Sequence, residues 1–170
     1  LINFAHGEIF MMSGYFMIFS MAVFPWYISI PVTIIGTVVL GVVIEKAAYA
    51  PLRQSPRMSV MISAIGVSYF LQNFATYLFS ALPQAYPEIS FLKQIFNIGG
   101  VSASLVTFLT PVLTIVLVVL LMLLINHSKM GMAMRAVSKD FETSQLMGIK
   151  INRVITATFA IGSALAAIGS

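Results

Sequence analysis

The sequence predicts an all-α fold, a polytopic bundle of transmembrane helices with about five membrane segments. Only 8% of its 170 residues are charged and 59% are hydrophobic, whereas about a quarter of the residues of a soluble domain are charged. Five apolar stretches also have the length of a membrane helix. In lipid, only helices and closed barrels satisfy every backbone hydrogen bond. Because the ten-residue alternating pattern of barrel strands is absent, helices are the expected elements.

The five expected membrane segments follow one another along the whole chain. They are residues 1–24, 31–48, 58–82, 105–125 and 154–170. The fourth, with 21 residues, would be about 32 Å long as a helix, enough to cross a hydrocarbon core of about 30 Å. The last stays apolar to the final residue, and Leu1 is not an initiator. We therefore expect one transmembrane domain, residues 1–170, that is a fragment truncated at both ends.

Basic residues are distributed unequally between the connections. Eight of the nine belong to two connections: Lys46, Arg53, Arg57, Lys129, Arg135, Lys139, Lys150 and Arg153. The opposite connections carry Lys93 alone. By the positive-inside rule, the two basic connections face the cytoplasm. Residues 25–27 and 86–87 are then expected as outer turns with aromatic anchors at the membrane interface.

Composition and motifs narrow the classes of function. The chain has no cysteine, which excludes disulfides, thiol catalysis and cysteine metal sites. Its net charge of +4 comes from the ends of apolar runs and not from a basic face with interleaved aromatics, so nucleic acid is not an expected partner. No Walker-type G-x-x-x-x-G-K-[ST] motif is present, so the chain cannot bind ATP in that way. His6 and Glu8 are too few ligands for a metal, and we expect neither a cofactor nor enzyme activity.

Two of the apolar segments contain polar groups. These groups are Asn3, His6, Gly7 and Glu8 in the first segment and Ser63, Gly66, Ser68, Gln72 and Asn73 in the third. A charge at the bilayer centre costs about 2.5 to 3.5 kcal/mol on insertion scales, so it should face protein, water or the interface. Such paired interruptions of apolar helices indicate a translocation path. Two alternatives stay open: Glu8 as a snorkelling charge at a helix end, and Gln72 with Asn73 as interhelical hydrogen-bonding groups.

The loop of residues 126–153 is expected to contain two short helices. Ser128 can cap the first, whose apolar residues fall on one face. The second would run from Phe141 to Met147, with Asp140 as its N-cap and Gly148 just past its end. A two-turn helix is unstable alone in water, so it should lie against its own membrane domain or another protein. A solvated linker is the alternative.

Four stretches of the chain resemble the permease subunits of branched-chain amino acid ABC importers of the LivH type. They are INFAHGEIFMMSGY, YAPLRQSP, SAIGVSYFLQN and GMAMRAVSKDFETSQLMGIKINRVI, in the order and spacing expected of that family. Within the last, ETSQLMG resembles the E-A-A-x-x-x-G core of the coupling loop, with Thr143 and Ser144 in place of the two alanines and without the downstream I-x-L-P. The resemblance covers essentially the whole chain.

The resemblance implies a multi-pass transport subunit of the bacterial cytoplasmic (inner) membrane. Its expected partners are ATP-binding ABC subunits, a second permease subunit, and an extracytoplasmic binding protein that delivers leucine, isoleucine or valine. The coupling loop would include Arg135, Asp140, Glu142 and Gly148, with Phe141 and Leu146 as the apolar contacts of the docked helix. The family's intramembrane motifs match Asn3, His6, Gly7, Glu8, Gln72 and Asn73.

Two other functions are compatible with the sequence. ABC permeases for urea or short-chain amides are very similar to the branched-chain type, and a permease sequence indicates its substrate poorly. A proton-coupled secondary transporter would use His6 and Glu8 to carry its proton. Such a carrier has no need for a coupling loop.

Overall fold

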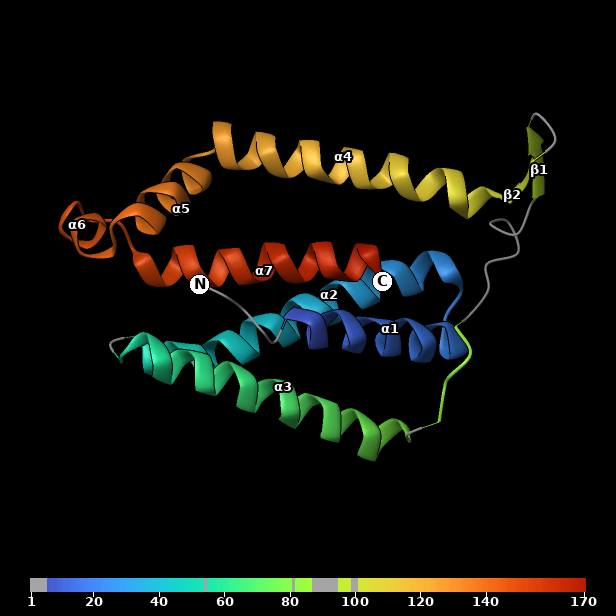
Figure 1. The fold of residues 1–170 in the computed structure, drawn as a ribbon, viewed down its shortest axis with the longest axis horizontal. Coiled ribbons are helices and arrows are strands. Elements are labelled where there is room, and N and C mark those ends of the chain that lie inside the picture. Colours follow the sequence, from blue (N-terminus) through green and yellow to red (C-terminus); the bar gives the residue numbers. More distant parts are fainter. Residues whose placement is uncertain (1–5, 54, 81, 87–94, 99–100) are drawn as a thin grey trace. The chain divides into compact units, whose positions relative to one another are not determined.

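The computed structural model describes residues 6–53, 55–80, 82–86, 95–98 and 101–170. Its contacts divide the chain into two compact units, residues 1–86 with 155–170, and residues 87–154. The helices of the first unit are α1 (His6–Val23), α2 (Trp26–Ile44), α3 (Arg57–Phe79) and most of α7 (Ile151–Gly169) (Figure 1). The second unit contains β1 (Ile95–Ile98), β2 (Val101–Ser104), α4 (Leu105–His127), α5 (Lys129–Lys139) and α6 (Phe141–Leu146). The expected all-α fold is confirmed, with the addition of one small hairpin.

Four of the described helices are long and apolar enough to cross a membrane. These candidate spans are Trp26–Leu52, Met58–Phe79, Leu105–His127 and Ile151–Gly169. They agree with four of the five expected segments and with a polytopic bundle. α1 is not among them, because its 18 residues begin with the polar triplet His6, Gly7 and Glu8. The start of that first expected segment, residues 1–5, lies outside the described residues.

α2 begins five residues earlier than expected. The expected turn at residues 25–27 is wrong beyond Pro25, because Trp26 and Tyr27 already belong to the first turn of α2. The N–H groups of the first turn need no intrahelical acceptor, so a helix can begin directly after a proline. At its other end, α2 continues into a π-helix, η1 (Glu45–Tyr49), and a 3₁₀ turn, η2 (Ala50–Leu52).

α3 ends at Phe79, three residues before the expected end. Ser80 has a positive φ of 71°, and its Oγ accepts a hydrogen bond from Leu82 N at 3.2 Å. Tyr86, an expected interface anchor, forms a side-chain hydrogen bond with Ser170. Pro87, the other residue of the expected outer turn, lies outside the described residues. The chain therefore turns immediately after α3.

A β-hairpin lies in the expected outer connection between the third and fourth membrane segments. β1 and β2 pair antiparallel, with Ile95 opposite Ser104 and Ile98 opposite Val101. The dipeptide between them in the sequence is Gly99-Gly100, which tight hairpin turns favour. Strands of four residues are too short to show the alternating pattern of a membrane strand, so the sequence pattern did not reveal them.

α2 packs against its neighbours through small residues spaced four apart. This small-residue stripe consists of Ser29, Thr33, Thr37 and Gly41, all of them buried. Thr33 Oγ1 lies 3.3 Å from Ser20 Oγ of α1. Between helices in lipid, small residues permit close backbone approach, and hydroxyl pairs add hydrogen bonds. Within the stripe, Thr33 therefore contacts α1, where its Oγ1 also lies 3.6 Å from Met17 Sδ.

α7 approaches α2 closely at Gly41. An ideal Cβ at Gly41 would lie 1.9 Å from Ser163 Oγ of α7. We expect Gly41→Val to destabilise the protein by about 1 to 3 kcal/mol, the usual cost of overpacking, measured as a lower thermal unfolding midpoint in detergent. Gly66→Val is the matched control, because a Cβ at Gly66 would meet no atom within 4 Å. Equal losses in both variants would contradict the close approach.

Candidate functional site

A hydrogen-bonded cluster joins α1 to the middle of α3. Ser68 Oγ donates to Glu8 Oε1 at 2.8 Å, and Gln72 Nε2 donates to the same oxygen at 2.6 Å. Ser68 lies 11 residues from either end of α3. At a rise of about 1.5 Å per residue, the carboxylate therefore lies roughly 17 Å from each end of that helix. We name Glu8, Ser68 and Gln72 the mid-span cluster.

Glu8 belongs to the first turn of α1, yet its carboxylate lies opposite the centre of α3. Snorkelling needs a carboxylate near the membrane surface, whereas this one lies opposite the centre of the candidate span Met58–Phe79. Both hydrogen bonds reach Oε1, and among the described residues Oε2 accepts none. Glu8 is half-buried and Gln72 is exposed. Within the described part of the chain, Oε2 thus keeps its capacity to accept a hydrogen bond.

Two other residues predicted for the path lie apart from this cluster. Asn73 Nδ2 donates to Tyr69 O of its own helix at 2.7 Å, so this contact joins no second helix. His6 lies beside α7, since an ideal Cβ at Gly162 would lie 3.3 Å from His6 Cε1. The expected set is therefore divided between the α3 and α7 sides of α1.

The remaining predicted path residues add no contact to the cluster. An ideal Cβ at Gly7 would meet no atom within 4 Å, and Asn3 lies outside the described residues. Ser68, by contrast, was expected only as one of the polar groups of the third segment and was not assigned to the path from the sequence. The available signal was its spacing, four residues before Gln72, which places both side chains on one face of a helix.

In the second unit, α4 and α5 are joined by a single residue. The backbone N–H of Ser128 donates to Leu124 O at 3.1 Å, and its Oγ accepts from Gly131 N at 2.9 Å. The predicted Ser128 cap is therefore confirmed. An ideal Cβ at Gly131 would lie 2.3 Å from Ile125 O, so this bend requires glycine.

Asp140 joins α5 to α6 in the same way. Its backbone N–H donates to Ala136 O at 3.1 Å, and its carboxylate accepts hydrogen bonds from the hydroxyl and the backbone N–H of Thr143. These bonds hold the pKa of Asp140 below its ordinary value of 3.8. A group with a depressed folded pKa stabilises the fold above its unfolded pKa and loses this effect as pH falls through the folded pKa. The predicted cap is confirmed and is fully formed at neutral pH.

α6 ends in a Schellman motif at Gly148. Gly148 N donates to Gln145 O at 3.0 Å, and Ile149 N donates to Ser144 O at 3.1 Å. The φ of Gly148 is +79°, a conformation that glycine adopts without a steric penalty. The predicted stop at Gly148 is confirmed, although α6 ends at Leu146, one residue earlier than expected.

The surface of α6 presents apolar side chains beside an acidic one. We name Phe141, Glu142, Leu146 and Met147 the α6 surface. Leu146 is 88% exposed and Met147 is 80% exposed. These two apolar side chains therefore contribute little to the packing of their own unit.

Arg135 has a different position from the α6 surface. Its Nη1 donates to Asn126 Oδ1 at 3.3 Å, near the end of α4. The guanidinium therefore braces the bend between α4 and α5. Its predicted contact with a partner stays a prediction.

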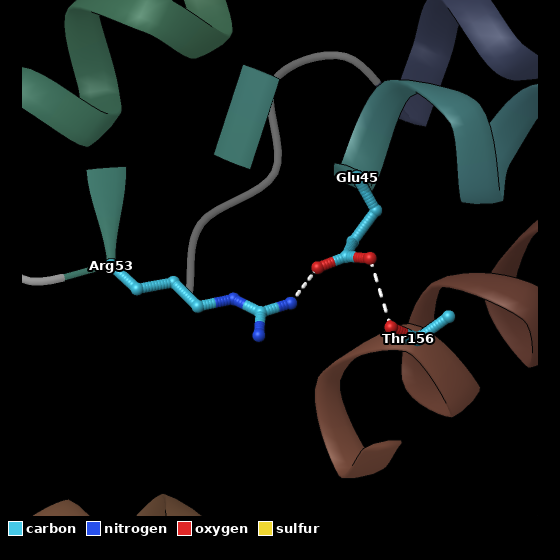
Figure 2. Close-up of polar contacts among 3 residues, drawn as sticks. All are labelled: Glu45, Arg53 and Thr156. Atoms are coloured by element: carbon cyan, nitrogen blue, oxygen red, sulfur yellow. Dashed lines mark hydrogen bonds and ion pairs between the residues drawn. The ribbon is translucent and has the colours of Figure 1, made fainter. Parts of the chain in front are cut away.

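Glu45 is a buried acidic residue that the sequence did not reveal as part of a site. Its side chain is 0% exposed, forms an ion pair with Arg53, and accepts a hydrogen bond from Thr156 Oγ1 at 2.9 Å (Figure 2). Burial lowers the pKa of the Arg53 guanidinium, which still remains charged at neutral pH. Within the part of the chain that the structure describes, no group of three or more His, Cys, Asp or Glu side chains is placed to hold a metal ion.

Known proteins match the whole chain. Residues 1–170 match the family described as branched-chain amino acid transport system / permease component. The high-affinity branched-chain amino acid transport system permease protein BraD of Pseudomonas aeruginosa strain PAO1 is 36% identical over 183 residues, which cover 100% of this chain and 60% of that protein. The permease protein LivH of Escherichia coli strain K12 is 36% identical over 182 residues, and LivH of Salmonella typhimurium strain LT2 is 35% identical over 181. Each of these two matches covers 99% of this chain and 59% of the relative.

The matches also show what share of each relative's length this chain covers. The chain spans about 60% of the length of the curated relatives that it matches. No solved structure matches it significantly. Because the family match extends over all 170 residues, the chain belongs to the family of branched-chain amino acid transport system permease components.

Proposed function

We propose that this chain is the membrane-spanning permease subunit of an ABC importer that moves leucine, isoleucine and valine across the bacterial cytoplasmic membrane. ATP hydrolysis on separate subunits drives the transport. The observation that carries the proposal is α6, a helix of six residues that is capped at both ends and exposes Leu146 and Met147, in a chain of this family. Relatives named as branched-chain amino acid permeases support the substrate class.

In this proposal, the ATP-binding subunit binds the α6 surface. Ser128 and Asp140 are the only residues between α4, α5 and α6, so these helices are connected without a flexible loop. A force applied to α6 is therefore passed on along the chain and is not absorbed by a flexible loop. Residues 126–153 and the turn around Arg53 would face the cytoplasm, as the distribution of basic residues predicts. A second permease subunit and an extracytoplasmic binding protein complete the importer.

The mid-span cluster lies, in this proposal, beside the translocation path. A free amino acid carries an ammonium group, which needs an acceptor when it leaves water. Glu8 Oε2 accepts no hydrogen bond from the described residues, while Ser68 and Gln72 orient the carboxylate through Oε1. The cluster is thus suited to accept the ammonium group at the middle of the membrane. The side chain of the substrate would face apolar surfaces of the neighbouring helices.

The direct test uses the intact importer in vesicles, with its ATP-binding subunits and binding protein. We expect uptake of radiolabelled leucine that requires ATP and persists when the proton gradient is collapsed. Loss of uptake on collapse of the gradient, with ATP present, would indicate a proton-coupled carrier. Uptake of urea or acetamide without uptake of leucine would assign the chain to the amide-transporting type.

A further inference from the structure

The end of α2 is a junction that α3 also contacts. In η1 the helix widens to a π-turn, so that Ala50 N donates to Glu45 O, five residues back. Ser63 Oγ of α3 donates to Ala48 O within this turn at 3.2 Å. π-turns are rare and occur frequently at functional sites. The junction therefore fastens the start of α3 to the end of α2.

α7 is fastened to the same junction by a stripe on one of its faces. Three residues of α7, spaced three and four apart, each meet a partner on α2 or η1: the pairs are Thr156 with Glu45, Phe159 with Tyr49, and Ser163 with Gly41. The ring centroids of Tyr49 and Phe159 are 5.1 Å apart. Residues with this spacing share one face of a helix. α7 thus follows the end of α2 over about two turns.

The Glu45 carboxylate contacts both the chain that follows α2 and the helix α7. Figure 2 shows Arg53 on one side of the carboxylate and Thr156 on the other. Arg53 lies just past η2, eight residues after Glu45, and neutralises its charge, whereas Thr156 lies 111 residues further along the chain. Loss of either partner would leave a buried carboxylate without compensation for its desolvation cost. Both the ion pair and the hydrogen bond are therefore costly to break. Arg53 therefore balances the charge, and Thr156 provides the link to α7.

We propose that Glu45 is a positioning residue for transport, which holds the first turns of α7 to the α2–α3 junction through its hydrogen bond with Thr156. Thr156 is the sixth residue of α7, and only residues 147–150 separate α6 from α7. Displacement of α6 therefore reaches the Glu45–Thr156 bond through a short piece of chain and a stiff helix. The bond passes this displacement on to α2 and α3. This inference rests on the proposed function, because it assumes that α6 receives the movement from an ATP-binding subunit.

The test measures the number of leucine molecules moved per ATP hydrolysed by the intact importer in vesicles. Thr156→Val removes the hydroxyl at nearly constant shape and leaves the ion pair of Glu45 with Arg53 in place. Thr156→Ser is the matched control, because it keeps the hydroxyl. We expect Thr156→Val to assemble and hydrolyse ATP like the wild type while the ratio falls about tenfold, within the usual range of coupling between sites. Thr156→Ser should restore the wild-type ratio.

Other outcomes would overturn the inference. A wild-type ratio in Thr156→Val shows that the bond passes on no movement. A parallel loss of assembly, hydrolysis and transport shows a purely structural contact. Glu45→Gln keeps an acceptor for Thr156, so its assembled fraction should retain the ratio, and a tenfold drop there would assign the effect to the charge. If the wild type itself moves no leucine with ATP, the proposed function fails, which these vesicles distinguish from failure of the inference alone.

Discussion

Leu146→Asp is expected to release the ATP-binding subunits from the permease. The Leu146 side chain is 88% exposed, so its replacement removes little from the fold of its own unit. On docking, a carboxylate at this position would have to leave water for an apolar pocket without a partner. Anchor residues of this kind contribute about 2 kcal/mol or more, so affinity should fall roughly 30-fold or more. The measurement is co-purification of the ATP-binding subunits in detergent, together with ATPase activity stimulated by the loaded binding protein.

Variants of the two residues that bound α6, Asp140 and Gly148, and a matched control complete this experiment. Gly148→Val forces a β-branched residue to a φ of +79°, Asp140→Ala removes the cap, and both should weaken docking. Gln145→Asp adds the same negative charge to the same helix at an exposed polar residue and should retain the subunits. Full retention and full stimulated hydrolysis in Leu146→Asp, Asp140→Ala and Gly148→Val would mean that α6 is an ordinary solvated helix.

Glu8→Gln is expected to lower leucine uptake about tenfold at normal membrane abundance. Glutamine preserves the size of the side chain but removes the negative charge that would pair with the substrate ammonium. Hydrogen bonds to charged groups contribute about 1.5 to 3 kcal/mol, against about 0.5 to 1.5 for neutral ones, and this difference corresponds to roughly tenfold. The measurement is the initial rate of radiolabelled leucine uptake, normalised to permease abundance by immunoblot.

Thr76→Val serves as the matched control for Glu8→Gln. Thr76 lies one turn beyond Gln72, and its Oγ1 donates to Gln72 O within α3 at 2.9 Å. Its replacement leaves the Glu8 carboxylate and its two donors unchanged, so uptake should stay at the wild-type rate. Wild-type uptake in Glu8→Gln would instead reduce the mid-span cluster to a structural link between α1 and α3.

Much of the second unit could be predicted because its determinants are local. The caps of α5 and α6 each join a side chain to a backbone N–H three residues away, at Ser128 with Gly131 and at Asp140 with Thr143. Gly148 ends α6 because a single residue supplies the positive φ. Such interactions lie within one turn, so the order of the amino acids contains all the information that they need. The membrane segments are predictable for a similar reason, since hydropathy sums over consecutive residues.

The polar contacts within the first unit depended on the packing of the helices. Glu8 meets Ser68 across 60 residues of chain, and Glu45 meets Thr156 across 111. In the sequence, Glu45 is an ordinary charge at the end of an apolar run and Thr156 an ordinary hydroxyl near the start of another. Hydropathy determines which residues enter the membrane but not how a helix is rotated about its axis or which neighbour it faces. Those two choices are made by close packing, such as that of Gly41 against Ser163, and they decide which polar groups meet.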